Sequence, residues 1–168
     1  MNPLEKEVDS YVKLAKQMMT FLETGTLRIL LVEDNPMDVE MFKSKLEKAT
    51  LHYDVDTVDN STDAFFKIKT GVYHLIVLDW HLGHEEHTGL DIVKILHEQG
   101  FEFAFVIFTS RAEDYLEAAR HNCLGCIDKL SCTTESLDAD LIHAIKNGVL
   151  ISGSPTIHNE SSVLALTH

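Results

Sequence analysis

Short apolar runs and stretches of helical periodicity alternate along most of this chain. Continuous apolar runs bounded by turn residues are typical of strands that are buried on both faces of a parallel sheet. The predicted strands are residues 27–32, 53–58, 75–79, 103–109 and 126–128. The spacing between them predicts helices at 36–49, 61–71, 90–99, 112–121 and 135–147. Strands that alternate with helices in this way predict an α/β sandwich with a parallel sheet and right-handed crossovers.

Particular residues set the expected ends of several helices. Asn35 followed by Pro36 fits an N-cap and a first helical position. Asn60 or Ser61 is a candidate cap for the second of these helices. Gly100 is the expected stop of the third.

Residues 1–25 carry a separate pattern, which predicts an extra amphipathic helix that ends at Gly25. Its apolar positions are spaced by 4, 3, 4, 3 and 4 residues, which is the spacing of a heptad seam. The seam consists of Leu4, Val8, Tyr11, Ala15, Met18 and Leu22. Two hypotheses stay open: this helix packs back on the domain, or it pairs in a coiled coil with a second copy or another partner. The expected organisation is therefore this helix, a domain over 26–148 and a tail over 149–168 that contains Gly, Ser and Pro.

Composition and charge narrow the class of protein. Of the 168 residues, 45% are apolar, which is ordinary for a globular domain. No apolar run is long enough to span a bilayer and the N-terminus has no signal pattern, so we expect a cytoplasmic protein without a membrane partner. The formal net charge of −13 argues against a nucleic-acid partner and permits a divalent cation or a basic protein. The three cysteines do not form a framework of the secreted type, so reduced thiols are expected.

Charged and hydroxyl side chains stand at the carboxyl ends of four predicted strands. In an open parallel sheet these ends share one edge, and ligands bind outside that edge. The residues in question are Glu33, Asp34, Asp79, Thr109, Asp128 and Lys129. Clustered carboxylates repel one another unless a cation neutralises them, and hard oxygen ligands suit Mg²⁺.

Each of these residue types has a chemical role in accepting a phosphoryl group. Asp79 ends the most central strand and is the expected nucleophile. The expected Mg²⁺ ligands are Glu33, Asp34, Asp79 and the backbone carbonyl at His81. The Lys129 ammonium and the Thr109 hydroxyl are expected to bind the phosphoryl oxygens.

Four segments, in this order and at strand ends, resemble the signature segments of the receiver domain of two-component response regulators: RILLVEDNP, LIVLDW, FVIFTS and CIDKL. The resemblance covers about residues 27–148. It implies a flavodoxin-like fold with the strand order 2-1-3-4-5. It also implies a phosphohistidine donor on a sensor histidine kinase or phosphotransfer protein, and an aspartyl phosphate that hydrolyses spontaneously.

The resemblance further implies a regulatory domain rather than an independent enzyme. Phosphorylation would draw Thr109 inward and shift the face made by the fourth helix, fifth strand and fifth helix of the domain. This face and the N-terminal helix are the two candidate surfaces for a homodimer. Because no output domain is recognised after residue 148, we expect output through contact with a downstream protein target.

Two departures from the usual receiver pattern lie beside Lys129. Leu130 follows Lys129, where receivers usually carry Pro, so the shape of this loop is not fixed by a proline. Cys126 stands three residues before the lysine, where receivers usually carry Tyr or Phe. An aromatic flip at this position therefore cannot be the output signal.

Three other interpretations stay open. A phosphate-independent interaction module, or pseudo-receiver, would use the N-terminal helix as its working surface. A thiol redox protein would use Cys123 and Cys126, which have C-x-x-C spacing. The loop with His81, His84 and His87 is a candidate site for Zn²⁺ or Ni²⁺, although the spacing matches no fixed cage.

Overall fold

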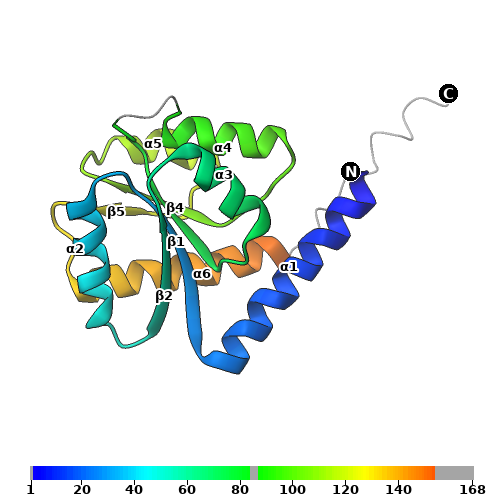
Figure 1. Cartoon of the computed structure of the whole chain (residues 1–168), viewed down its shortest axis with the longest axis horizontal. Coiled ribbons are helices and arrows are strands. Elements are labelled where there is room, and N and C mark those ends of the chain that lie inside the picture. Colours follow the sequence, from blue (N-terminus) through cyan, green and yellow to red (C-terminus); the bar gives the residue numbers. More distant parts are fainter. Residues whose placement is uncertain (1, 84–86, 154–168) are drawn as a thin grey trace.

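A computed structural model of the chain describes residues 2–83 and 87–153 (Figure 1). The elements are α1 (Pro3–Thr24), β1 (Thr26–Val32), α2 (Pro36–Glu47), β2 (His52–Val58), α3 (Ser61–Thr70), β3 (Leu75–Asp79), α4 (Gly89–Glu98), β4 (Phe105–Thr109), α5 (Asp114–Ala119), β5 (Cys126–Asp128) and α6 (Thr134–Gly153). The strands form one parallel sheet in the order β2-β1-β3-β4-β5. The structure thereby confirms the predicted flavodoxin-like sandwich and its additional N-terminal helix.

Helices cover both faces of the sheet (Figure 1). Helices α3, α4 and α5 pack on one face, and α2 and α6 pack on the other. Successive side chains of a strand point to opposite faces, so Leu30 and Val32 join the first layer and Ile29 and Leu31 join the second. All four side chains are fully buried. The continuous apolar runs of the sequence are thus explained by burial on both faces.

The residues expected to cap helices do so. The Asn35 side chain accepts a hydrogen bond from the Met37 N–H at 3.0 Å, and Pro36 is the first residue of α2. Asn60, rather than Ser61, is the N-cap of α3. These caps fix where α2 and α3 begin, directly beyond the carboxyl ends of β1 and β2.

Helices α5 and α6 differ most from the sequence-based prediction. Helix α6 continues past Asn147 to Gly153, so residues 149–153 of the predicted tail are helical. Gly148 lies inside this helix because of close packing: an added Cβ would lie 2.7 Å from the Ala104 Cβ. Residues 154–168, the remainder of the predicted tail, lie outside the described residues. Helix α5 is shorter than predicted at both ends, and no side chain caps its first turn.

Helix α1 ends at Gly25, whose φ of 64° lies in the left-handed region, as expected for a helix stop. The helix contacts β1 and α6 and extends along one side of the sandwich (Figure 1). Three seam residues in its first half are exposed, namely Leu4, Val8 and Tyr11. In residues 2–83 and 87–153, none of the helices combines the length and hydropathy needed to cross a bilayer.

Candidate functional site

The sheet brings the residues predicted from the sequence to one edge. Glu33 and Asp34 directly follow β1, and Asp79 is the last residue of β3. Thr109 ends β4 and pairs in register with Asp128, the last residue of β5. The neighbouring parallel strands therefore place these polar groups side by side, as the pattern of strand ends predicted.

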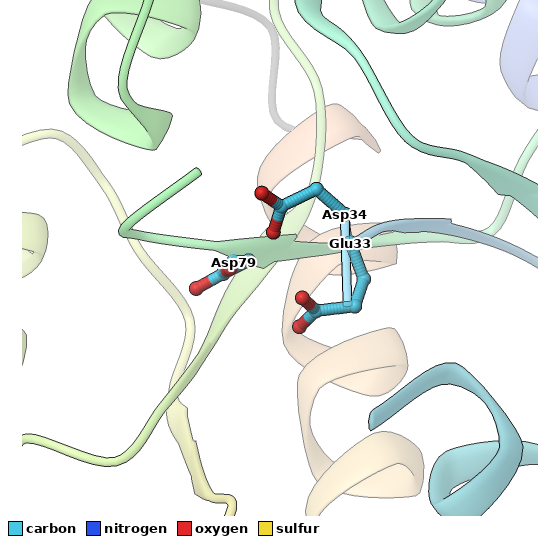
Figure 2. Close-up of side chains that lie close together, drawn as sticks. All are labelled: Glu33, Asp34 and Asp79. Carbon is cyan, nitrogen blue, oxygen red and sulfur yellow. The ribbon is translucent and has the colours of Figure 1, made fainter. Parts of the chain in front are cut away.

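Three carboxylates form a cluster at this edge. One oxygen from each of Glu33, Asp34 and Asp79 lies within 4.8 Å of the other two, and Figure 2 shows the side chains gathered at the ends of β1 and β3. Glu33 and Asp79 are buried, with 1% and 3% of their surface exposed. The backbone N–H of Gly83 donates to Asp34 Oδ2 at 2.8 Å, and that of His81 donates to Asp79 Oδ1 at 3.1 Å. The loop after β3 thus orients two of the three carboxylates.

Lys129 is the cation that faces this cluster. Its Nζ lies 2.6 Å from Glu33 Oε2, 3.0 Å from Asp38 Oδ2 and 3.4 Å from Asp79 Oδ1. The sequence predicted Lys129 at this edge but missed Asp38, which lies in the first turn of α2. The available signal was the position of α2, because a helix that starts beyond the end of β1 brings its first turn to the same edge.

Burial sets how tightly these groups hold protons. It raises the pKa of Glu33 to about 7, although the nearby Lys129 ammonium and the Asn35 N–H act in the opposite direction. Burial also raises the pKa of Asp79, while the Lys129 charge and the His81 N–H lower it. Burial by itself lowers the pKa of Lys129, but the hydrogen bonds and charges of the surrounding carboxylates outweigh it and raise this pKa. The two buried carboxyl groups therefore hold their protons to higher pH than exposed carboxyl groups do.

Thr109 is buried at the end of β4, but its hydroxyl has an unforeseen partner. Thr109 Oγ1 donates a hydrogen bond to Asp114 Oδ2 at 2.6 Å and accepts one from the Arg111 N–H at 3.1 Å. Asp114 Oδ2 also lies 2.9 Å from His81 Nε2. No sequence pattern pointed to Asp114, because its role depends on how the loop after β4 turns back.

The cluster offers the donor set that suits Mg²⁺. Hard carboxylate and carbonyl oxygens are the ligands this ion prefers. Glu33 Oε2 is buried and accepts no well-angled hydrogen bond from any described residue, even though Lys129 Nζ is only 2.6 Å away. A buried acceptor oxygen of this kind, beside two further carboxylates, is stabilised by a divalent cation. The carboxylates of Glu33, Asp34 and Asp79 lie close enough together to hold such an ion.

Comparison with known proteins decides the family. The family model described as the response regulator receiver domain matches residues 29–142. The chain belongs to this family. It is a response regulator receiver domain of two-component systems. Receiver domains are regulatory modules rather than classical enzymes.

Relatives of known sequence agree with this assignment. The chain is 32% identical over 89 residues to the transcriptional regulatory protein DltR of Streptococcus agalactiae, over 53% of this chain and 38% of the relative. The match therefore spans well under half the length of that relative. It supports the receiver assignment, but it does not extend to the rest of the relative or to the activity of the whole relative.

Solved receiver domains share the fold. The signal receiver domain of a LuxO repressor protein from Vibrio parahaemolyticus has a TM-score of 0.64 and 19% identity, covering 85% of this chain and 99% of the other. The Francisella response regulator 1452 receiver domain has a TM-score of 0.60 and 21% identity, covering 72% and 98%. At these identities the likeness concerns the fold alone.

The receiver loop after Lys129 is ordered without the usual proline. Asp128 Oδ1 accepts a hydrogen bond from the Leu130 N–H at 2.8 Å, and Asp128 Oδ2 accepts one from Ser131 Oγ at 2.7 Å. None of the described residues has a cis peptide bond. A carboxylate that bridges the turn therefore replaces the proline as the element that shapes this loop.

The alternative uses of the cysteines and histidines find little support in this receiver domain. Burial raises the pKa of Cys123, and it raises the pKa of Cys126 to about 11, so both thiols are poorly ionised near neutral pH. The His81 ring contacts the Asp114 carboxylate through Nε2, and the His87 ring packs edge-on against the Phe65 ring. His84 lies outside the described residues.

Without metal, the receiver domain is expected to lose stability as the pH rises from about 4.5 to about 7. In this window the unfolded chain has released the Glu33 proton, whereas the folded protein still holds it, because burial raises this pKa from 4.5 to about 7. The part due to Glu33 amounts to about 3 kcal/mol at most. Urea unfolding at pH 5 and pH 8 in the presence of EDTA measures it.

The Glu33→Gln protein is the control for this effect, because it lacks the titrating group and should show a flatter dependence on pH. Saturating Mg²⁺ should restore part of the stability of the wild-type protein at pH 8. Equal slopes for the wild-type and Glu33→Gln proteins would contradict the assignment of the raised pKa to Glu33.

Proposed function

We propose that this receiver domain is a phosphorylation-dependent switch in which Asp79 accepts a phosphoryl group. The donor is a phosphohistidine on a sensor histidine kinase or a phosphotransfer protein. The observation that supports this most directly is the convergence of Lys129 and two further carboxylates, those of Glu33 and Asp34, on Asp79 at the carboxyl edge of the sheet. A merely solvated acidic edge would not require a buried lysine or buried carboxylates.

The proposed transfer is a direct displacement at phosphorus. A carboxylate oxygen of Asp79 attacks the phosphorus, the bond between phosphorus and the imidazole nitrogen breaks, and the electron pair leaves with the imidazole, which is thereby restored. The product is an acyl phosphate, which water later hydrolyses to regenerate the carboxylate. Bound Mg²⁺ would supply neutralisation of the charge on the phosphoryl oxygens.

Lys129 and Thr109 act by binding the negatively charged phosphoryl oxygens. Lys129 Nζ, 3.4 Å from Asp79 Oδ1, is positioned to bind a phosphoryl oxygen while keeping its contact with Asp38. The Thr109 hydroxyl, at the end of the neighbouring strand, supplies a donor once it leaves Asp114. Charge-assisted hydrogen bonds of this kind are stronger than neutral ones, so the phosphoryl group stabilises a rearranged site.

The switch is proposed to act in the cytoplasm and to signal through contact with a downstream protein, without nucleic acid. The face made by α5, β5 and α6 is the expected output surface. It corresponds to the fourth helix, fifth strand and fifth helix of the domain without α1. Among the exposed large apolar side chains of the described residues are Tyr115 and Leu116 of α5, which are 38% and 73% exposed.

Trp80 provides the test of the phospho-acceptor function. This residue adjoins Asp79, is buried, and donates from Nε1 to Glu117 Oε1 of α5 at 3.0 Å. Mg²⁺ is titrated while the fluorescence is followed, and beryllofluoride is then added as a phosphoryl mimic. A saturable Mg²⁺ response followed by a further change is expected. Mg²⁺ binding without any response to beryllofluoride would instead favour the pseudo-receiver interpretation.

We also propose that α1 pairs two copies of this chain in a parallel coiled coil. The seam residues Leu4 and Val8 are 68% and 53% exposed, whereas the Lys6 side chain extends to Gly100. The Lys6 side chain is therefore directed toward the domain, and the apolar side chains of Leu4 and Val8 are left to solvent. In a parallel pair, Glu7 of one copy faces the apolar Val12 of the other, so the flanking positions bring no like charges together.

Replacing Leu4 and Val8 together with Ser is expected to convert a dimer into a monomer. The substitution removes two apolar layers of a seam with only three heptads, which is marginal by itself. Sedimentation equilibrium measures the mass. The matched control is Asp9→Ser, on an exposed position outside the seam, which should leave the dimer intact. A wild-type protein that stays monomeric at high concentration would exclude this pairing.

A further inference from the structure

The hydroxyl of Thr109 is already committed to a partner in this structure. It donates to Asp114 Oδ2 at 2.6 Å, a short distance that is typical of a hydrogen bond to a charged acceptor. Asp114 is the first residue of α5, and only 11% of its side chain is exposed. A largely buried carboxylate that accepts such a bond holds the hydroxyl firmly.

A threonine hydroxyl has one proton and makes one strong donation at a time. The remaining capacity of Thr109 Oγ1 is used as an acceptor, because the Arg111 N–H donates to it at 3.1 Å. The hydroxyl therefore cannot donate to Asp114 and to a phosphoryl oxygen together. The two acceptors exclude each other.

We propose that Asp114 is a positioning residue that opposes phosphorylation by competing with the phosphoryl group for the Thr109 proton. This inference rests on the function proposed for Asp79. The unphosphorylated state keeps the bond between Thr109 and Asp114, and the phosphorylated state breaks it. Breaking the bond between Thr109 and Asp114 costs free energy. The interactions of the phosphoryl group must supply this free energy before the domain can switch.

The same bond links the site to α5. Asp114 Oδ2 contacts His81 Nε2 at 2.9 Å, and Glu117 Oε1 accepts from Trp80 Nε1 at 3.0 Å. Two carboxylates of one short helix thus bond to the two residues that follow Asp79. When Thr109 leaves Asp114, one of the bonds that hold α5 against the site is lost. The exposed Tyr115 and Leu116 lie on this helix, so their surface changes with the state of Thr109.

The test measures the concentration of beryllofluoride that half-saturates the Trp80 signal at saturating Mg²⁺. Asp114→Ala removes the competing acceptor and is expected to lower this concentration about tenfold or more, the factor that a hydrogen bond to a charged group represents. Asp114→Asn keeps the size and a neutral acceptor, so a smaller shift in the same direction is expected. The Asn protein also tests the bond if the Ala protein fails to fold.

Two controls separate this role from a general effect of charge. Glu113→Gln removes a negative charge from the adjacent position, whose side chain caps no N–H of α5, and should leave the half-saturation unchanged. Asp114→Ala is also made in a Thr109→Val background, where no hydroxyl remains to compete for. There the shift should vanish, because Asp114 acts through Thr109.

The outcomes distinguish the two proposals. If the wild-type protein binds beryllofluoride and the Asp114 variants bind it equally well, the competition by Asp114 is excluded while the phospho-acceptor function stands. A shift that persists undiminished in the Thr109→Val background also excludes it, because the effect then does not pass through the hydroxyl. If the wild-type protein does not respond at all, the function proposed for Asp79 fails first.

Discussion

The Asp79→Asn protein is expected to take up no phosphoryl group from acetyl phosphate, whereas the wild-type receiver domain becomes phosphorylated. The amide has nearly the shape of the carboxylate but lacks its negative charge and its nucleophilic oxygen. The site should otherwise persist, because Asp79 is buried among groups that the amide still contacts, such as the His81 N–H. Intact-protein mass spectrometry after incubation with Mg²⁺ and acetyl phosphate measures the uptake.

A matched control is Asp59→Asn. Asp59 follows the end of β2, at the same edge of the sheet, but it is exposed and does not belong to the carboxylate cluster. This variant should be phosphorylated like the wild-type protein. A phosphoryl group on the Asp79→Asn protein would show that another residue is the acceptor, and an unmodified wild-type protein would remove the basis of the proposed function.

The Lys129→Met protein is expected to lose both stability and affinity for the phosphoryl mimic. Lys129 faces carboxylates of Glu33, Asp38 and Asp79 within 3.4 Å, and only 13% of its side chain is exposed. Removing one partner of a buried ion pair leaves an uncompensated charge and costs about 3–5 kcal/mol. Loss of one charge-assisted contact to the phosphoryl mimic should weaken its binding roughly tenfold or more. Urea unfolding at pH 7 and the beryllofluoride titration measure the two losses.

Lys48→Met is the control for the loss of a lysine, since Lys48 is exposed at the end of α2. A second substitution should recover part of the stability. Combining Lys129→Met with Glu33→Gln removes the most deeply buried of the carboxylates that Lys129 faces, so the two losses should not add. Full additivity would mean that the ion pair of Lys129 with Glu33 does not stabilise the fold.

Most of the fold could be predicted because β1, β3 and β4 are apolar runs in the sequence, whereas β2 has a weaker pattern of alternating polar and apolar residues. Burial on both faces allows only apolar side chains, so the strand that ends at Asp79 reads almost identically in the sequence and in the structure. The N-caps Asn35 and Asn60 could be predicted from the sequence, because capping depends on residues that are neighbours along the chain. The end of α6 could not be predicted from the sequence. A glycine usually marks a helix end, but Gly148 lies within α6 because it packs closely against Ala104.

The loop after Lys129 likewise could be predicted only in part from the sequence. The sequence shows that Leu130 replaces a proline, but it does not show what shapes the loop in its place. The structure assigns that role to Asp128, which accepts hydrogen bonds from Leu130 and Ser131. A local turn of this kind depends on the backbone path that the neighbouring strand and helix impose.

By itself, the sequence determined the order of the elements and the set of groups at the carboxyl edge, because strand periodicity and parallel pairing place strand ends together. Only the tertiary structure decided the partners of those groups. Thr109 donates to Asp114, Lys129 also faces Asp38, and the Trp80 indole reaches Glu117. Each partner comes from another loop or helix, and its position depends on backbone turns and side-chain rotamers that packing selects and that no residue spacing specifies.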